Sequence, residues 1–328
     1  MSKPVNKTVL RWIATIVLLA IVAWLIGREV VASWQRLAAY EFSLSWPLVA
    51  LSVALGAGYY FFNSQAWRYA VQRSGQQVSI AQAYRLYALS VFGRYVPGKA
   101  WLALIRMELG ARLGISRTAT TVALLYENGL QLTTGVVISA VLGASLFAGH
   151  GHAGLLAVLA AVLCLIVLAP PVFYRLLNAL LRLVRRAPFD RAHQLRFGHM
   201  ARMVGFFVGV WVCGGASLYI LAVALDSTLA DRPVQIGLIF VVSQVLGFVA
   251  LFAPGGLGVR EWVQMELLMQ ITTPEQAIIL PFLARVALVA AEVIQGAILQ
   301  AALTRAHAAT SGRAEQQAVA DGRDIDDP

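Results

Sequence analysis

Ionisable side chains lie inside long apolar stretches of this 328-residue chain, where they could hold a charged ligand. Glu127 falls within the apolar run 119–147. Arg285 and Glu292 fall within the run 277–303, seven residues apart, so on a helix they project from one face. A charge at the centre of a bilayer costs about 2.5–3.5 kcal/mol on insertion scales, so these groups are expected to face a cavity or a partner.

Two further segments, 93–101 and 253–262, combine proline, glycine and charge within otherwise apolar sequence. Proline removes a backbone donor and glycine loosens the chain, so a helix is expected to break at both places. The apolar pieces that flank the first segment, 84–92 and 102–105, are each too short to cross a bilayer. The two segments contribute these residues to a candidate substrate-binding site: Arg94, Pro97, Gly98, Lys99, Pro254, Gly255, Gly256, Gly258, Arg260 and Glu261.

The two segments resemble each other in sequence. Each contains Pro-Gly, then a cation (Lys99 or Arg260), then a tryptophan, and each precedes a long helix that carries an acid, Glu127 or Glu292. This pattern indicates an internal repeat of a broken-helix unit, which transporters place where loose backbone lines a polar cavity. The alternative is a pair of ordinary turns at the membrane interface, with their tryptophans in the aromatic belt.

These charges together predict a polar groove within the membrane. Arg94, Lys99 and Arg260 would hold a lipid phosphate, because arginine meets phosphate oxygens with two donors. Glu127 and Glu292 would neutralise these cations in the absence of a ligand, or bind a proton as the site turns over. The alternative, for the charged pair in the last apolar run above all, is a set of buried ion pairs that fix helix packing.

The composition excludes a soluble globular domain. Hydrophobic residues make up 59% of the chain and charged residues 13%, whereas soluble domains carry about 25% charged residues. Continuous apolar runs predict helices, because only helices or closed barrels can cross lipid. The sequence therefore predicts an all-α, polytopic transmembrane helix bundle of about seven or eight membrane elements, including two broken or re-entrant Pro-Gly segments. The apolar runs are 12–26, 46–62, 119–147, 153–172, 203–225, 234–253 and 277–303.

The chain divides into one apolar domain and a polar tail. A single transmembrane domain is expected over residues 1–303, and a disordered polar tail over 304–328, which is rich in Ala, Gln, Gly and Asp. The aromatic residues 59–62 come at the end of the second apolar run, so they predict an interfacial aromatic belt.

The distribution of basic residues predicts the orientation of the helices. The connection 173–202 carries seven arginines and one acid, so it is expected to face the cytoplasm. The connections 149–154 and 226–232 are poor in basic residues and are expected to face outward. The basic N-terminus is then cytoplasmic, in a multi-pass protein of a bacterial-type inner (plasma) membrane.

The net charge and the missing motifs limit the classes of function. The formal net charge of +10 lies in the connections, so the expected partner is an anionic phospholipid or a lipid-linked substrate rather than nucleic acid. The chain lacks the phosphate-loop, His-Glu-x-x-His, Gly-x-Ser-x-Gly and Cys-x-x-Cys patterns, and His150-x-His152 has no further ligand nearby. No metal, no cofactor and no catalytic residue is expected, which favours a transporter over an enzyme.

The two Pro-Gly segments resemble the motifs of a known family. Residues 93–101 contain Arg-x-x-Pro-Gly and residues 254–261 read Pro-Gly-Gly-x-Gly-x-Arg-Glu, which is similar to the membrane domain of the lysylphosphatidylglycerol synthase/flippase family. The resemblance extends to about residue 303 and implies a lipid translocator, or a membrane protein that serves lipid-linked substrates. Members that act on aminoacylated lipids carry a soluble aminoacyl-transferase domain, for which the tail is too short, so synthase activity is not implied.

One departure from the family concerns the helix after the first motif. Members often have a Glu-Arg pair there and an aspartate further along, whereas this chain reads Glu127-Asn128-Gly129-Leu130-Gln131.

The leading hypothesis is a lipid translocase that uses the polar groove. The alternatives are an integral membrane transferase that modifies a lipid headgroup, and a non-transporting partner of an enzyme of lipid or glycan synthesis.

Overall fold

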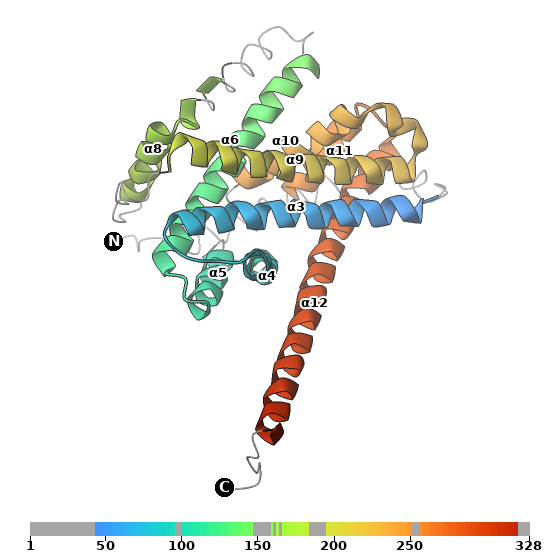
Figure 1. Cartoon of the computed structure of the whole chain (residues 1–328). Helices are drawn as coiled ribbons and strands as arrows, with labels where there is room; N and C mark the ends of the chain where they lie inside the picture. Colours follow the sequence, from blue (N-terminus) through green and yellow to red (C-terminus); the bar gives the residue numbers. More distant parts are fainter. Residues whose placement is uncertain are drawn as a thin grey trace, which may run out of the picture.

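The computed structural model describes residues 43–95, 100–146, 159, 162–163, 166–183, 195–250, 256 and 258–320. Over these residues the chain forms helices and no strand, as the all-α prediction requires (Figure 1). The helices, with two short 3-10 segments, are α3 (Trp46–Arg73), α4 (Ile80–Val91), η1 (Phe92–Tyr95), α5 (Ala100–Arg112), α6 (Arg117–Leu146), α8 (Pro170–Leu183), α9 (Phe197–Leu225), η3 (Ser227–Asp231), α10 (Pro233–Val249), α11 (Val259–Leu268) and α12 (Pro274–Ala320).

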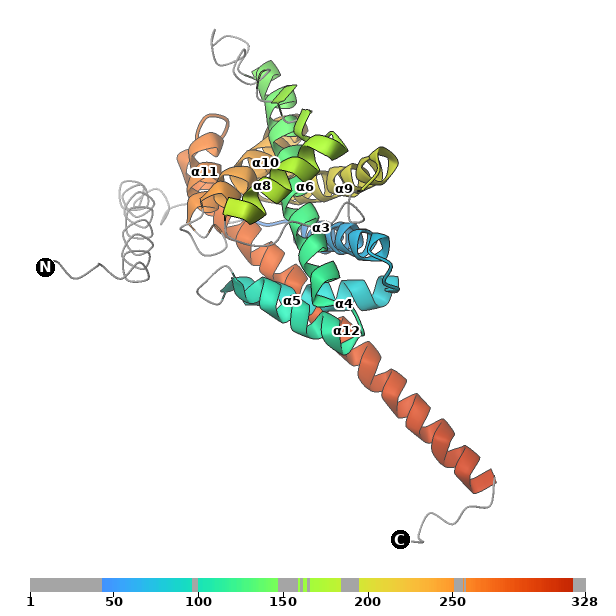
Figure 2. The same ribbon diagram turned by 90° about the vertical axis from the view of Figure 1, so that its left-hand side faces the viewer.

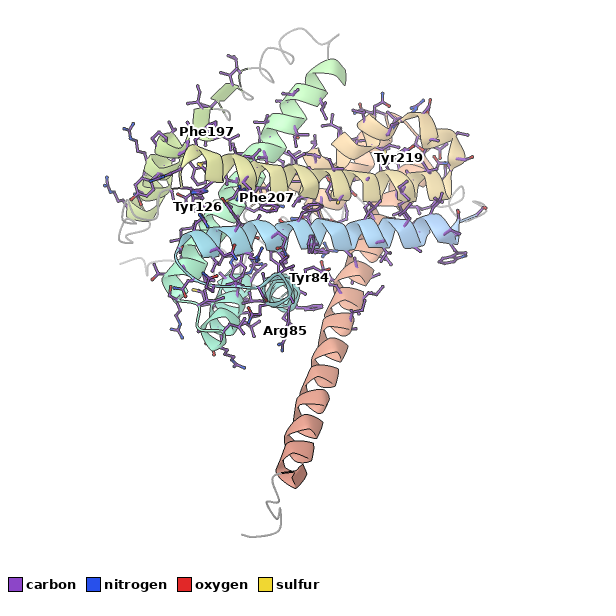
Figure 3. The ribbon with its side chains drawn as sticks, in the orientation of Figure 1. Tyr84, Arg85, Tyr126, Phe197, Phe207 and Tyr219 are labelled. Carbon is purple, nitrogen blue, oxygen red and sulfur yellow. The ribbon has the colours of Figure 1, made fainter. Side chains whose placement is uncertain are left out.

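Helices α3 and α9 form the closest pair and run antiparallel (Figure 1). In the first third of α3 and the last third of α9, the hydroxyls of Ser52 and Ser217 each donate to the other residue's carbonyl, at 2.8 and 2.9 Å. Small residues let membrane helices approach closely, and their hydroxyls then find partners across the interface. Phe207 of α9, labelled in Figure 3, is fully buried in the same core.

Helices α4 and α5 are short and pack against each other, with the first Pro-Gly segment between them. Ser79 and Gln82 form a capping box that starts α4, with Gln82 N–H donating to Ser79 Oγ at 3.2 Å. Gly93 follows α4, and a Cβ there would lie 2.8 Å from the Leu102 backbone of α5. Glycine is therefore required where the two helices approach each other.

Helices α6 and α10 complete the core around α9. A Cβ on Gly215 of α9 would lie 3.1 Å from Gly237 of α10, so two glycines face each other where these helices cross. Trp211 of α9 donates its indole N–H to the hydroxyl of Thr134 on α6 at 3.0 Å, which fixes α6 against α9. The long α6 thus carries Glu127 into the interior of the bundle.

Helix α12 begins at Pro274 and continues well beyond the other helices (Figures 1 and 2). Its first part packs against α3, α4 and α11. Residues 274–298 of α12 and the whole of α9 are, within the described chain, the helices long and apolar enough to cross a membrane by length and composition.

Most of the predicted apolar runs correspond to helices. The runs 119–147, 203–225, 234–253 and 277–303 fall on α6, α9, α10 and α12. The run 46–62 begins α3, which continues to Arg73. The run 12–26 and half of the run 153–172 lie outside the described residues.

One prediction differs from the structure. The aromatic residues 59–62 lie in the middle of α3, and Tyr60 is only 2% exposed, so the predicted interfacial belt is wrong for this side chain. Helix α12 continues as one helix to Ala320, and the division of the chain at residue 303 into an apolar domain and a disordered tail stays a prediction. Alanine, glutamine and arginine favour helix, and a helix already formed propagates without a new nucleation cost.

Candidate functional site

The centre of the candidate site is an ion pair between α5 and α6. Arg106 Nη1 lies 2.6 Å from Glu127 Oε2, and the two side chains are 0% and 5% exposed. Arg106 Nε also donates to Ser90 Oγ at 3.0 Å, and the Tyr87 hydroxyl donates to Glu127 Oε1 at 3.1 Å. Since Tyr87 and Ser90 belong to α4, the pair joins both short helices to α6.

Aromatic rings cover the Arg106 guanidinium. Its central carbon lies 4.2 Å from the centroid of the Tyr87 ring and 5.9 Å from that of Trp67. A cation placed over an aromatic face is attracted to the ring electrons, by about 2 kcal/mol or more when both are desolvated. The two rings thus stabilise a guanidinium that is fully buried beside a carboxylate.

A second buried carboxyl lies on α12. Glu292 is 1% exposed and accepts a hydrogen bond from the hydroxyl of Tyr60 on α3. Next to it, the Tyr59 ring meets the Tyr60 ring edge-on, with centroids 5.1 Å apart. The Tyr59 hydroxyl accepts from Gln131 Nε2 on α6 at 3.3 Å, so polar contacts link α3 to α6 as well as to α12.

One face of α3 connects the two carboxyls. Tyr60, Asn63, Ser64 and Trp67 follow helical spacing, so their side chains share that face, and all four are buried. We call these four residues the polar seam. The rise of a helix separates Tyr60 from Trp67 by about 10 Å, so the seam leads from Glu292 at one end to Arg106 and its carboxylate at the other.

Several buried polar atoms along this path lack a hydrogen bond to any described residue. These atoms are Asn63 Oδ1, Trp67 Nε1, Arg106 Nη2, and the Nε2 and Oε1 atoms of Gln295 on α12. Leaving such a group unsatisfied costs about 1–3 kcal/mol, and more for a charged one. The set includes both donors and acceptors, so it could satisfy a polar ligand that carries phosphate and hydroxyl groups.

The second Pro-Gly segment places Arg260 against glycine backbone. A Cβ on Gly247 of α10 would lie 2.3 Å from Arg260 Cγ. Gly256 has φ +73°, and a Cβ there would lie 2.8 Å from both Arg260 Nε and the Gly247 carbonyl oxygen. The half-buried arginine therefore lies across two glycines. A side chain at either glycine position would occupy the space that Arg260 fills.

The acid beside Arg260 serves its own helix. Glu261 accepts the Gly258 N–H at 2.7 Å, so it caps the first turn of α11. Gly258 has φ +80°, a conformation that favours glycine. This contact is a helix cap and leaves the carboxylate less available to a ligand.

The other predicted site residues are only partly described. Arg285 is half-buried on α12 and projects from the same face of that helix as Glu292. For Arg94 the structure describes the backbone, which lies in η1. The remaining five lie outside the described residues: Pro97, Gly98, Lys99, Pro254 and Gly255.

Sequence reasoning missed the partners of both carboxyls. Glu127 pairs with Arg106, the residue that follows the short apolar piece 102–105. Yet Arg106 stands between Ile105 and Met107, and the argument from buried charge that selected Glu127 applies equally to it. Tyr60 carried no comparable signal, because aromatic residues are common at membrane interfaces.

The family model for the lysylphosphatidylglycerol synthase TM region matches residues 11–296. The chain belongs to this family. No curated protein matches it. The matched range contains both Pro-Gly segments, the polar seam and Glu292. As a member of the lysylphosphatidylglycerol synthase TM region family, the chain is a membrane protein concerned with lipid headgroup handling or translocation.

Proposed function

We propose that the chain is a lipid translocase that moves a phospholipid or lipid-linked headgroup across a bacterial-type inner membrane. The observation that carries this proposal is the fully buried ion pair of Arg106 and Glu127 in a family of lipid-headgroup proteins. Charged groups inside a membrane domain are costly and typically mark the path of a polar substrate. The lipid tails would stay in the bilayer while the headgroup follows the polar seam.

The short helices supply the geometry for such a path. Helices α4 and α5 have 12 and 13 residues, which corresponds to about 18–20 Å, whereas a hydrocarbon core is about 30 Å thick. We take them as two half-crossing helices of a re-entrant unit. Helices α10 and α11, with 17 and 10 residues, form the corresponding unit around Arg260.

Arg106 has the chemistry for the central step. Its Nη1 binds Glu127 and its Nη2 points to no described partner, so the two nitrogens can instead take two oxygens of one phosphate. The phosphate would replace the carboxylate, and Glu127 would then take up a proton or another cation. The polar atoms of Asn63 and Trp67 would guide the headgroup towards Glu292 and Arg285.

A neutral version of the pair tests this role. In the double variant Arg106→Gln/Glu127→Gln, both charges are removed together, so neither remains buried without its partner. Translocation of a fluorescent anionic phospholipid is measured in proteoliposomes that contain the full chain. We expect the double variant to lose nearly all translocation while inserting and folding normally.

The matched control is the exposed pair on α5. Glu108 and Arg112 lie 3.5 Å apart with side chains more than half exposed, so Glu108→Gln/Arg112→Gln makes the same chemical change in water. This control is expected to translocate lipid like the wild type. A rate for Arg106→Gln/Glu127→Gln equal to that of the control would show that the buried pair only holds helices together.

A further inference from the structure

A cluster of basic side chains surrounds Tyr69 where the end of α3 meets the start of α9. The Tyr69 hydroxyl makes a 2.7 Å hydrogen bond with His199 Nδ1. The guanidinium carbons of Arg73 and Arg202 each lie 5.4 Å from the centroid of the Tyr69 ring. Arg196 is the residue directly before α9. We call these five residues the Tyr69 cluster; both helix ends lie on the same side of the molecule (Figure 1).

The cluster collects positive charge without a carboxylate. Arg73, Arg196 and Arg202 are exposed, and all three lie within electrostatic reach of His199. Among the described residues none of these arginines forms an ion pair, whereas Arg232 lies 3.7 Å from the carboxylate of Asp231. The N-cap of α9 offers no side-chain acceptor, so the positive end of its helix dipole adds to the field. Like charges repel, so a bound anion would stabilise this arrangement.

The surface beside the cluster is apolar. Phe197, at the first turn of α9, is 74% exposed (Figure 3). Gly205, Val208 and Val212 continue the exposed face along α9, and a Cβ on Gly205 would meet nothing within 4 Å. Cations at one end of an open apolar stripe match a molecule with an anionic head and an acyl chain.

We propose that the Tyr69 cluster binds the phosphodiester of an anionic phospholipid, whose acyl chain lies along the exposed face of α9. Arg73 and Arg202 hold the phosphate oxygens, and the Tyr69 ring forms the floor between them. The site is separate from the polar seam, because Tyr69 follows Trp67 by two residues and so projects from a different side of α3. It binds a resident lipid whether or not the seam moves a substrate.

Native mass spectrometry of the full chain in detergent tests the site. Phosphatidylglycerol is the anionic probe and phosphatidylcholine the zwitterionic one. We expect phosphatidylglycerol to remain bound to the wild type and to bind Arg73→Gln/Arg202→Gln about 25-fold more weakly, about fivefold per arginine, since each basic residue near an anionic surface contributes about 1 kcal/mol. Both residues are exposed, so the variant should keep its fold, which its melting temperature checks.

Arg112→Gln/Arg117→Gln is the matched control. It removes the same two charges from arginines that share Glu108. Phosphatidylglycerol should bind this control as it binds the wild type. Equal binding by Arg73→Gln/Arg202→Gln and the control would overturn the proposal. Binding of glycerol phosphate, which has no acyl chains, to the cluster at the same concentration as the lipid would also overturn the proposal. The ligand would then be a soluble anion.

Discussion

The two Pro-Gly segments have similar sequences but use charge differently. After the first, the cation of α5, Arg106, reaches across to Glu127 on α6. After the second, the acid of α11, Glu261, turns back to cap its own helix, and Arg260 lies on the backbone of glycines. One unit is therefore joined to its long helix by an ion pair, and the other is shaped by close backbone contact.

This difference separates two ways of holding the helices on either side of a Pro-Gly segment. An ion pair can exchange one partner for a charged ligand, so the first unit suits reversible binding. Close packing against glycine depends on shape, so the second unit suits a fixed support. The first unit should therefore be sensitive to loss of charge and the second to added volume.

The largest effect is expected from breaking the ion pair on one side. Arg106→Gln leaves Glu127 buried without its cation, which should lower the free energy of unfolding by about 3–5 kcal/mol. Chemical unfolding in mild detergent measures this loss. The exposed Arg112→Gln should change stability by less than about 1 kcal/mol. Recovery of most of the loss in Arg106→Gln/Glu127→Gln would identify the uncompensated charge as its cause.

A volume change tests the second unit. Gly256→Ala places a Cβ at φ +73°, 2.8 Å from the Gly247 carbonyl oxygen, and should cost about 2–4 kcal/mol through backbone strain and overpacking. Gly75→Ala is the control, because Gly75 also has positive φ but nothing lies within 4 Å of its Cβ. It should cost only the strain, about 1–2 kcal/mol. Equal losses in the two variants would mean that contact around Arg260 does not shape this unit.

The second buried carboxyl, Glu292, allows a smaller test of the buried polar path. Tyr60→Phe removes the hydroxyl that donates to Glu292 and should lower the free energy of unfolding by about 1–3 kcal/mol. Tyr219→Phe removes an exposed hydroxyl that donates to the Ala230 carbonyl at 2.8 Å, so its effect should be at the low end of a single hydrogen bond, about 0.5 kcal/mol. A loss no larger in Tyr60→Phe than in Tyr219→Phe would remove Glu292 from the buried polar path.

The sequence predicted the helices better than the contacts between them. Long apolar runs and Pro-Gly breaks are local signals, so α9 and α10 were anticipated within a few residues of their ends. The length of α3 was underestimated, because its second half is polar yet buried by other helices. A hydropathy pattern assigns such residues to a connection between helices, because it cannot distinguish a polar side chain in water from one inside a bundle.

The site was predicted in part for the same reason. Glu127 and Glu292 stood out as charges that needed partners, and both are buried with one. Their partners lie 21 and 232 residues away along the chain, so only the packing of helices brings them together. Residue types alone favoured Arg94, Lys99 and Arg260 as the cations, and could not reveal that the short α5 turns Arg106 towards α6.

The smallest effect is expected outside the long apolar helices, at a carboxylate in the connection that follows α9. Asp226, after α9, accepts the Thr228 hydroxyl at 2.7 Å, Gln276 Nε2 at 2.7 Å and the Thr228 N–H at 2.9 Å. Hydrogen bonds from Thr228 and then Gln276 hold the pKa of Asp226 below its ordinary value. Asp226→Ala should therefore lower the free energy of unfolding by about 1 kcal/mol near neutral pH, as loss of a cap does.

The pH dependence of this difference distinguishes it from the buried pair. Because the folded pKa of Asp226 is lowered, its contribution is fully present above the unfolded pKa of about 3.9 and disappears as the pH falls through the folded value. Unfolding of the wild type and Asp226→Ala between about pH 6 and 3 should show two curves that converge at the acid end. A gap that stays constant over this range would assign the effect to lost packing. The contrast between the half-buried cap and the buried ion pair would then depend on the Arg106 variants alone.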